Sequence, residues 1–239
     1  NDHSLDVLGG FSAYRFASHD FNLSGKGYMD DAIMWNNMNA VLDKETYSAG
    51  TSYSKKTKMS VYARLNYNWK SRYYLTVTGR YDGASNFAAN NKWAFFSSAA
   101  FKWNLANENF LKNCRWIDDL SIRMSAGLTG NDAISTYRSL ATLSSTTGGY
   151  LFAGSQPVAF YRSRLDSPDL TWEKTAAYNI ALDWSMFKGR LNITAEAYKS
   201  KTTDLLMSLA VASQTGYTSR WTNIGSTPNK GVELSIESQ

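Results

Sequence analysis

Apolar and polar side chains alternate along several long segments of the chain. From Met59 to Trp69 every second residue is apolar or aromatic, and most of the residues between them are polar. A period of two places alternate side chains on opposite faces of a β-strand. Residues 73–81 repeat the pattern after the short polar turn at 70–72. The two segments are therefore predicted to form a β-hairpin.

Six further ladders share this period. They occupy residues 93–103, 120–128, 176–186 and 191–197, with less complete ladders at 5–16 and 232–236. The pattern therefore predicts an all-β fold with about eight strands in antiparallel order.

The ladder from Trp93 to Trp103 indicates the surroundings of these strands, because aromatic residues lie at both ends of its apolar face. Ten steps of about 3.4 Å, tilted by about 40°, span a height of roughly 26 Å, close to the apolar band of an outer-membrane barrel. We therefore expect a transmembrane β-barrel segment. The residues expected in its lipid-facing aromatic girdle are Trp69, Tyr73, Trp93, Phe95, Phe101, Trp103 and Trp184.

Charged residues avoid the predicted lipid face. A Lys or Arg on that face near the midplane would cost about 2 to 4 kcal/mol. The charged residues that fall on the opposite face are Arg64, Arg80, Lys102, Arg123, Asp183 and Glu196. A soluble β-sandwich with one wet face would alternate in the same way, so it stays open as an alternative.

The connections alternate in length. Residues 70–72 and 187–190 form short turns, 105–116 is a medium connection with room for one helical turn, and the long polar segments cover 19–58, 130–173 and 199–230. Outer-membrane barrels have short turns on one rim and long external loops on the other. The long segments are therefore predicted to be external loops, which commonly carry recognition.

Composition narrows the classes of function. The chain is 14% aromatic with only 3 Pro residues, which favours strands, and it has no apolar run of about 18 residues that could form a transmembrane helix. Its net charge of +5 comes from dispersed basic residues, which gives nucleic-acid binding no support. A single cysteine, Cys114, and two histidines offer neither an internal disulfide nor a metal-binding spacing.

Known catalytic motifs are missing from the sequence, so we expect no enzyme activity and no cofactor. The acidic pairs Asp118 with Asp119 and Asp169 with Glu173 are better explained as solvated rim charges than as a glycosidase pair. Aromatic residues in or beside the long loops are candidate substrate-binding residues, with internal loop packing as the alternative. They are Tyr161, Trp172, Tyr217 and Trp221.

A series of short segments, in a fixed order, carries a family resemblance. It comprises Asp82-Gly83-Ala84-Ser85-Asn86-Phe87, Asn91-Lys92-Trp93, the segments 122–131, 168–175 and 201–206, Asn223-Ile224-Gly225-Ser226, and residues 229–234. In order and spacing, from about residue 59 to the end, the series resembles SusC/RagA-type TonB-dependent transporters of Bacteroidetes outer membranes. Asn86 and Ala88 depart from the usual residues of that family, Arg and Gly.

The resemblance implies a 22-stranded barrel closed by an N-terminal plug. Residues 1–239 would then be part of that one barrel domain, with the plug and the remaining strands outside this chain. It also implies a SusD-like lipoprotein as partner and energy supplied by the TonB complex through segments that this chain does not contain.

The function expected from the sequence is active import of a nutrient across the outer membrane, with glycan oligosaccharides as the leading substrate and peptides as the alternative. A soluble β-rich glycan-binding module is the other interpretation. The two differ in whether outer-membrane lipid or a second sheet covers the apolar face.

Overall fold

The computed structural model describes residues 2–30, 32, 36–111, 114, 116–146, 151, 154, 157–217 and 219–238. Strands dominate this part of the chain, and no helix in it is long and apolar enough to cross a membrane. The chain divides into two units, one made of Asn1–Ala13 with Lys58–Gln239 and the other of Tyr14–Thr57.

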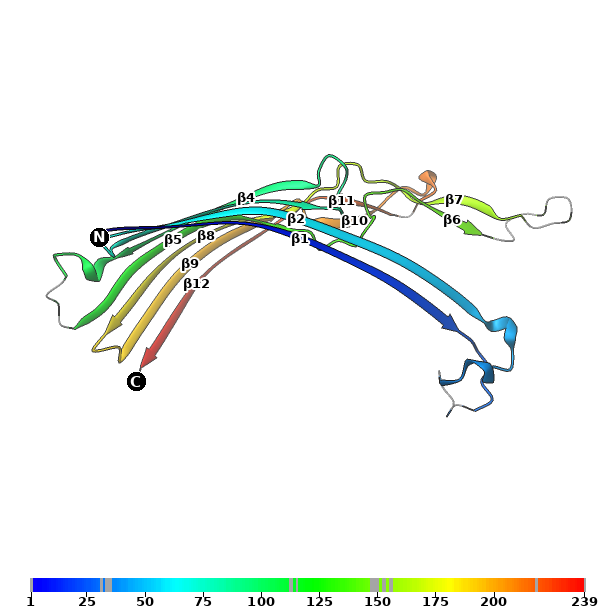
Figure 1. Cartoon of the computed structure of the whole chain (residues 1–239), viewed down its shortest axis with the longest axis horizontal. Coiled ribbons are helices and arrows are strands. Elements are labelled where there is room, and N and C mark those ends of the chain that lie inside the picture. The colour runs from blue at the N-terminus through cyan, green and yellow to red at the C-terminus, as the bar shows by residue number, and fades with distance from the viewer. Residues whose placement is uncertain are drawn as a thin grey trace. The chain divides into compact units, whose positions relative to one another are not determined.

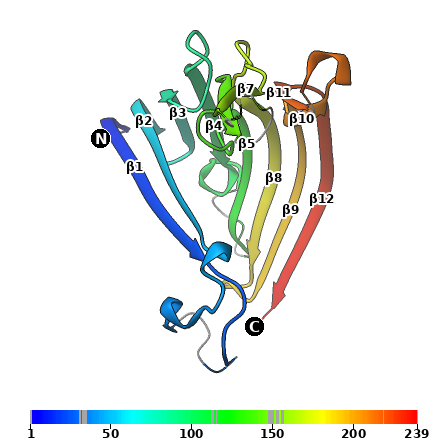
Figure 2. The ribbon, with the colours of Figure 1, turned by 90° about the vertical axis from the view of Figure 1, so that its right-hand side faces the viewer.

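Eight of the strands in the described residues form one antiparallel sheet, in which chain neighbours lie side by side (Figures 1 and 2). In sheet order they are β1 (His3–Ser24), β2 (Ser48–Trp69), β3 (Tyr73–Ala84), β4 (Trp93–Asn104), β5 (Ile117–Asn131), β8 (Glu173–Met186), β9 (Leu191–Thr203) and β12 (Ser226–Ser238). The prediction of about eight antiparallel strands is confirmed, and each strand contains one of the alternating ladders.

Tight turns join the strands at one end of the sheet. Trp69 of β2 lies opposite Tyr73 of β3, and both central residues of their turn, Lys70 and Ser71, have positive φ angles of 54° and 53°. Two positive φ angles are typical of a type I′ turn, here closed by the Arg72 N–H, which donates to the Trp69 carbonyl at 3.0 Å. The predicted helical turn is present as η4 (Leu105–Asn107) between β4 and β5.

The long connections at the other end contain two further hairpins. Strands β6 (Thr142–Thr146) and β7 (Ala159–Arg164) pair between β5 and β8, and β10 (Leu206–Ala210) pairs with β11 (Ser219–Asn223) between β9 and β12. A short 3-10 helix, η5 (Ser213–Thr215), lies between β10 and β11.

The prediction that residues 19–58 form a loop throughout is wrong at both ends. Strand β1 continues to Ser24 and β2 already begins at Ser48. The start of β2, residues 48–58, is rich in Ser, Thr and Lys and lacks the apolar alternation that marks the other strands. In β1 the alternation continues past Phe16, with Phe21 and Leu23 between polar residues, so the predicted strand ended too early.

The unit Tyr14–Thr57 contains the outer parts of β1 and β2 and two short helices, η2 (Met38–Ala40) and η3 (Lys44–Thr46). Val41 is only 1% exposed and forms an isolated β-bridge with Tyr28. The Thr46 hydroxyl accepts the Lys26 backbone N–H at 3.0 Å. These contacts give the unit a small core of its own.

Strands β4 and β5 separate towards the long-loop end. Their pairing ends at Ser98 opposite Gly127, although β4 extends to Trp93 and β5 to Asn131. Beyond this point β4 stays paired with β3 and β5 stays paired with β8. The separation provides space for side chains of the connecting loops.

Candidate functional site

The sheet of the larger unit has one apolar face, which we define by the odd-numbered residues of β2, β3, β4 and β9 and the even-numbered residues of β5, β8 and β12. Large side chains on this face are left uncovered, as shown by the exposed fractions of Val77 (43%), Ile180 (49%) and Leu234 (68%). Soluble monomers rarely expose contiguous apolar surface on this scale. The apolar face therefore needs a cover of lipid or protein.

Aromatic side chains concentrate towards the two ends of the apolar face. At the tight-turn end the Tyr73 ring lies 5.4 Å from the Trp69 ring and 6.2 Å from the Trp103 ring, between centroids. At the long-loop end Trp93 stacks on Tyr81 at 5.1 Å. The other residues expected in the girdle lie on the same face: Phe95 and Phe101 on β4 and Trp184 on β8. Their contact with lipid stays a prediction.

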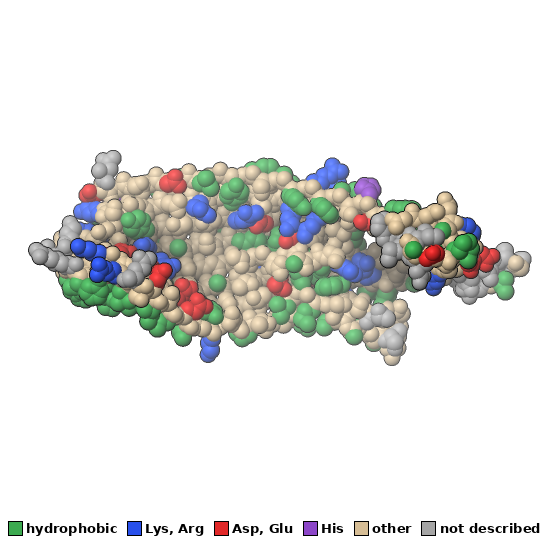
Figure 3. All heavy atoms as spheres, turned by 90° about the horizontal axis from the view of Figure 1, so that it is seen from below, with side chains coloured by type: hydrophobic (Ala, Val, Ile, Leu, Met, Phe, Trp, Pro, Cys, Tyr) green, Lys and Arg blue, Asp and Glu red, His purple; other side chains and the backbone are tan. Residues whose placement is uncertain are grey.

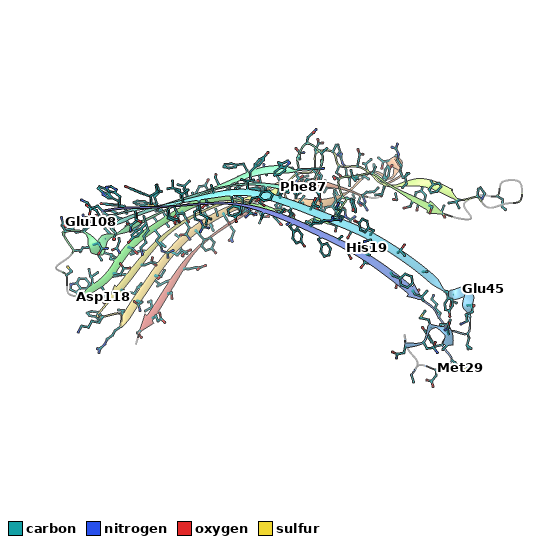
Figure 4. The ribbon with its side chains drawn as sticks, in the orientation of Figure 1. His19, Met29, Glu45, Phe87, Glu108 and Asp118 are labelled. Carbon is teal, nitrogen blue, oxygen red and sulfur yellow. The ribbon has the colours of Figure 1, made fainter. Side chains whose placement is uncertain are left out.

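Glu108, in the connection after η4, fixes the aromatic group at the tight-turn end. Its carboxylate accepts hydrogen bonds from the Tyr73 hydroxyl at 2.7 Å and the Trp103 indole N–H at 3.1 Å, and it pairs with Arg72 at 3.1 Å. The Tyr73 and Trp103 hydrogen bonds hold the pKa of Glu108 below its usual value. In Figure 4 Glu108 and Asp118 lie at this end, whereas Phe87 lies towards the loop hairpins.

The opposite face of the sheet is polar. Arg80 contacts Asp82 at 2.7 Å and donates to the Ser60 hydroxyl at 2.8 Å. Arg123 binds Asp183 with two hydrogen bonds across β5 and β8. Figure 3 shows basic and acidic side chains mixed over one face of the structure. The expected placement of charges away from the apolar face is confirmed for these residues.

A compact hydrophobic group, which we call the rim cluster, fills the separation of β4 and β5. Its buried members are Ala84, Phe87, Phe96, Ile134, Leu170 and Trp172. The Trp172 ring packs against the rings of Phe87 at 4.9 Å and Phe96 at 5.5 Å, between centroids. The cluster joins the β3–β4 loop to the β5–β8 connection, and so positions the loops that leave this end of the sheet.

Two asparagines bind backbone groups around the rim cluster. The Asn86 amide, 1% exposed, donates to the Asp132 and Ile134 carbonyls. Asn223 accepts the Thr171 N–H and donates to the Thr171 carbonyl, both at 2.8 Å. Side-chain amides that hydrogen-bond to backbone groups in this way hold a loop in place, as backbone hydrogen bonds hold a strand in a sheet.

A cleft of about 530 Å³ opens beside the rim cluster. The β3–β4 loop forms one side with Phe87, Asn90 and Lys92, and the stem of the β6–β7 hairpin contributes Tyr137 and Asp166. Apolar walls with a few polar groups, at this volume, are typical of small-ligand sites.

Of the four loop aromatics proposed from the sequence, Trp172 and Trp221 come together at the rim cluster, and the two tyrosines lie elsewhere. Trp172 is only 4% exposed and packs inside the rim cluster, which matches the internal-packing alternative. Trp221 packs at the edge of the cluster, with the Arg138 guanidinium 5.5 Å from its ring. Tyr161 is 53% exposed on β7, and Tyr217 is half-buried just before β11.

Several important residues escaped the sequence reasoning. Glu108 has no recognisable signal in the sequence, and Asn223 has only its place in a segment of the family resemblance, because their partners are 5 to 52 residues away along the chain. Asn86 lies in the 82–87 segment of the family resemblance, at a position where the family usually has Arg. Its burial follows from the motif around it, since the neighbouring Phe87 is 1% exposed and anchors the same loop.

The chain is similar to known receptors over almost its whole length. A family model described as "TonB dependent receptor-like, beta-barrel" matches residues 2–239. The TonB-dependent receptor P26 of Formosa agariphila is 36% identical over 235 residues, which are 98% of this chain and 23% of that protein. The TonB-dependent receptor SusC of Bacteroides thetaiotaomicron is 32% identical over 241 residues, covering 99% of this chain and 23% of its own length. This chain thus spans about a quarter of these relatives.

Solved structures of a transporter and a receptor are also similar to this chain. The RagAB peptide transporter aligns with 99% of this chain and 26% of its own chain, at a TM-score of 0.86 and 28% identity. The siderophore receptor PirA of Acinetobacter baumannii aligns at a TM-score of 0.56 and 16% identity, which shows the shared fold alone.

Proposed function

The chain belongs to the TonB-dependent receptor β-barrel family, and from this we propose that it forms part of the wall of an outer-membrane transporter that imports a nutrient. The single observation that carries the proposal is the match of the family model to residues 2–239. The uncovered apolar face supports it, because lipid is the cover that such a face has in this family. The soluble-module interpretation requires instead a second sheet packed on the apolar face.

Residues 1–239 make up, in this proposal, one part of a single barrel domain, with further strands and a plug supplied by other segments of the protein. The two outer strands of the sheet, β1 and β12, each have one edge that could pair with those strands. Closing the barrel removes such edges, which lipid cannot satisfy by hydrogen bonding.

Energy would come from the TonB complex, acting through segments outside this chain, and a SusD-like lipoprotein would cover the long-loop rim. Support for a lid comes from the resemblance to SusC and to RagAB. The β6–β7 and β10–β11 hairpins offer exposed loop surface for such a partner, with Leu143 68% and Phe160 73% exposed.

The proposed substrate is an oligomer, with glycan oligosaccharides as the first candidate. Tyr161 and Trp221 offer aromatic faces next to polar groups, a combination that suits sugar rings. Trp172 contributes to this site only through the rim cluster, since its ring is buried. Peptides are the second candidate, and the likeness to the RagAB peptide transporter favours them.

Uptake measurements in the source bacterium test the proposal. Cells lacking the full-length gene should lose uptake of one labelled oligomer class, and so should cells treated with a protonophore, because TonB-dependent transport draws on the proton gradient. Oligosaccharide and peptide pools, each supplied as sole carbon source, separate the two candidates. Normal uptake of both pools in the deletion strain would contradict the proposed function.

A further inference from the structure

Lysines interrupt the apolar face at the long-loop end of three adjacent strands. Alternation continues without a shift of register along β8, β9 and β12, so Lys174, Lys199, Lys201 and Lys230 have the parity of the apolar face. Lys199, Lys201 and Lys230 are exposed. The acidic residues of these strands in the described part of the chain fall on the opposite face, namely Glu173, Asp183, Glu196, Glu233 and Glu237.

Two of these lysines face each other directly. Lys199 of β9 is the register partner of Lys230 of β12, and Lys201 is the diagonal neighbour of Lys230. Like charges directly opposite in an antiparallel pair destabilise the sheet. Within the described residues, these three lysines lack a carboxylate partner within 4 Å. An anion between them would turn this repulsion into attraction.

An apolar hollow lies directly next to the lysines. Ala195 and Ala197 form its floor on β9, between Ile180 and Leu182 of β8 on one side and Val232 and Leu234 of β12 on the other. Its volume is about 610 Å³. Ala197 precedes Lys199 by two residues, about 7 Å along the strand. The small alanines between branched side chains leave a groove of the width of a hydrocarbon chain.

The lysines also lie at the right depth for lipid headgroups. Lys201 is ten residues from Leu191, the first residue of β9 after the tight turn. This corresponds to roughly 26 Å across a tilted strand, close to the height of the apolar band. Tyr178, the register partner of Lys199, is 59% exposed beside it. Lysine and tyrosine at this level are typical of a membrane interface.

We propose that this surface of β8, β9 and β12 binds a phosphate-bearing membrane lipid, with the phosphate between Lys199, Lys201 and Lys230 and one acyl chain over Ala195 and Ala197. The inference rests on the outer-membrane location in the proposed function. Charge complementarity selects an anionic lipid, because four lysines have the parity of this surface, whereas Glu196 and Glu233, which also border the hollow, have the parity of the opposite face. Free phosphate shares the headgroup chemistry but leaves the alanine groove unused.

The test uses the delipidated full-length protein in detergent, with diphosphoryl lipid A as probe and the same lipid without its phosphates as comparator. Wild-type protein should bind the phosphorylated lipid at least tenfold more tightly than the comparator, since three basic side chains close to one lipid phosphate each strengthen its binding. Inorganic phosphate at millimolar concentration should not displace it. Equal binding of the two lipids, or displacement by phosphate alone, would overturn the proposal without any variant.

Variants locate the site. A triple variant that carries Lys199→Gln, Lys201→Gln and Lys230→Gln should weaken lipid binding at least tenfold. Lys102→Gln on the polar face should leave lipid binding unchanged. Ala197→Phe, which fills the groove, should also weaken binding, and Ala99→Phe on β4 is its matched control. Wild-type affinity in the triple variant would contradict the assignment. The assay contains neither TonB, lid nor nutrient, so its failure and a failure of nutrient import are distinguishable.

Discussion

The Trp172 indole N–H donates to the main-chain carbonyl of Lys92 at 3.1 Å, across 80 residues of sequence. This bond, together with the packing of the Trp172 ring against the tilted Phe87 ring, ties the β5–β8 connection to the β3–β4 loop. The long-loop end of the sheet therefore has a small core of its own, separate from the apolar face. Loops that need to present recognition groups gain a fixed base in this way.

Removing Trp172 should loosen this base and leave the strands intact. Trp172→Ala in the full-length protein is expected to cost the rim cluster about 3 to 5 kcal/mol, as for other buried aromatics. Limited proteolysis should then cut between residues 130 and 173 faster, with an unchanged amount of heat-resistant folded barrel. Tyr161→Ala is the control, because Tyr161 is exposed. An unchanged cleavage rate for Trp172→Ala would contradict the role of the cluster.

Neighbouring alanines on β4 should differ sharply in their tolerance of charge. Ala99 lies opposite Val77 and Ala126 on the apolar face, whereas Ala100 lies opposite Thr76 and Ser125 on the polar face. Ala99→Arg should cost about 2 to 4 kcal/mol near the bilayer midplane. The band of folded, heat-resistant barrel should therefore weaken for Ala99→Arg and persist for Ala100→Arg. Equal bands for the two variants would show that the faces are wrongly assigned.

Glu108 should give the full-length protein a pH-dependent stability. Its pKa in the folded protein lies below the ordinary 4.5, chiefly because of the hydrogen bond from Tyr73. A lowered carboxylate pKa stabilises the fold above the ordinary pKa, and this contribution disappears as the pH falls through the folded-state value. Urea unfolding of wild type and Glu108→Gln should differ above pH 4.5 and converge as the pH falls through the lowered pKa of Glu108. A difference that does not change with pH would rule out the charge of Glu108 as its source.

The lengths of the connections predict which rim faces outside the cell. Ser145, exposed on β6, lies in the long-loop region, and Ser71 lies in the tight turn between β2 and β3. An impermeant thiol reagent on whole cells should label Ser145→Cys and leave Ser71→Cys unlabelled. Labelling of Ser71→Cys after cell lysis is the control that shows this cysteine to be reactive. The reverse result on whole cells would invert the topology.

The strands could be predicted from sequence because apolar alternation is a local property. Residues 93–103 predicted β4 (Trp93–Asn104) almost to the residue. The ladder at 191–197 stopped at Ala197 because the next residues of that parity are Lys199 and Lys201, although β9 continues to Thr203. Where lysine replaces an apolar side chain, the apolar alternation ends before the strand does. Alternation therefore could not predict the lysine surface.

The loop rim could not be predicted, because its contacts join segments far apart in the chain. The aromatic residues of the long loops fit both internal packing and ligand binding, and the sequence does not distinguish these two roles. The burial of Trp172 depends on Phe87 and Phe96, which lie 85 and 76 residues before it. Separation of β4 from β5 beyond Ser98 creates the space that these rings fill, and alternation alone carries no signal of such a separation.

The central claim is that one face of this sheet meets lipid and the other does not. Nitroxide labels placed one at a time at residues 95–101 of the full-length protein, in outer-membrane vesicles, test it most directly. Collision with oxygen should be high at Phe95, Ser97, Ala99 and Phe101, and collision with a water-soluble nickel complex should be low at the same positions. The residues between them should lack this lipid signature, which gives a period of two. Uniform values along the strand, or high nickel accessibility at Ala99, would contradict the account.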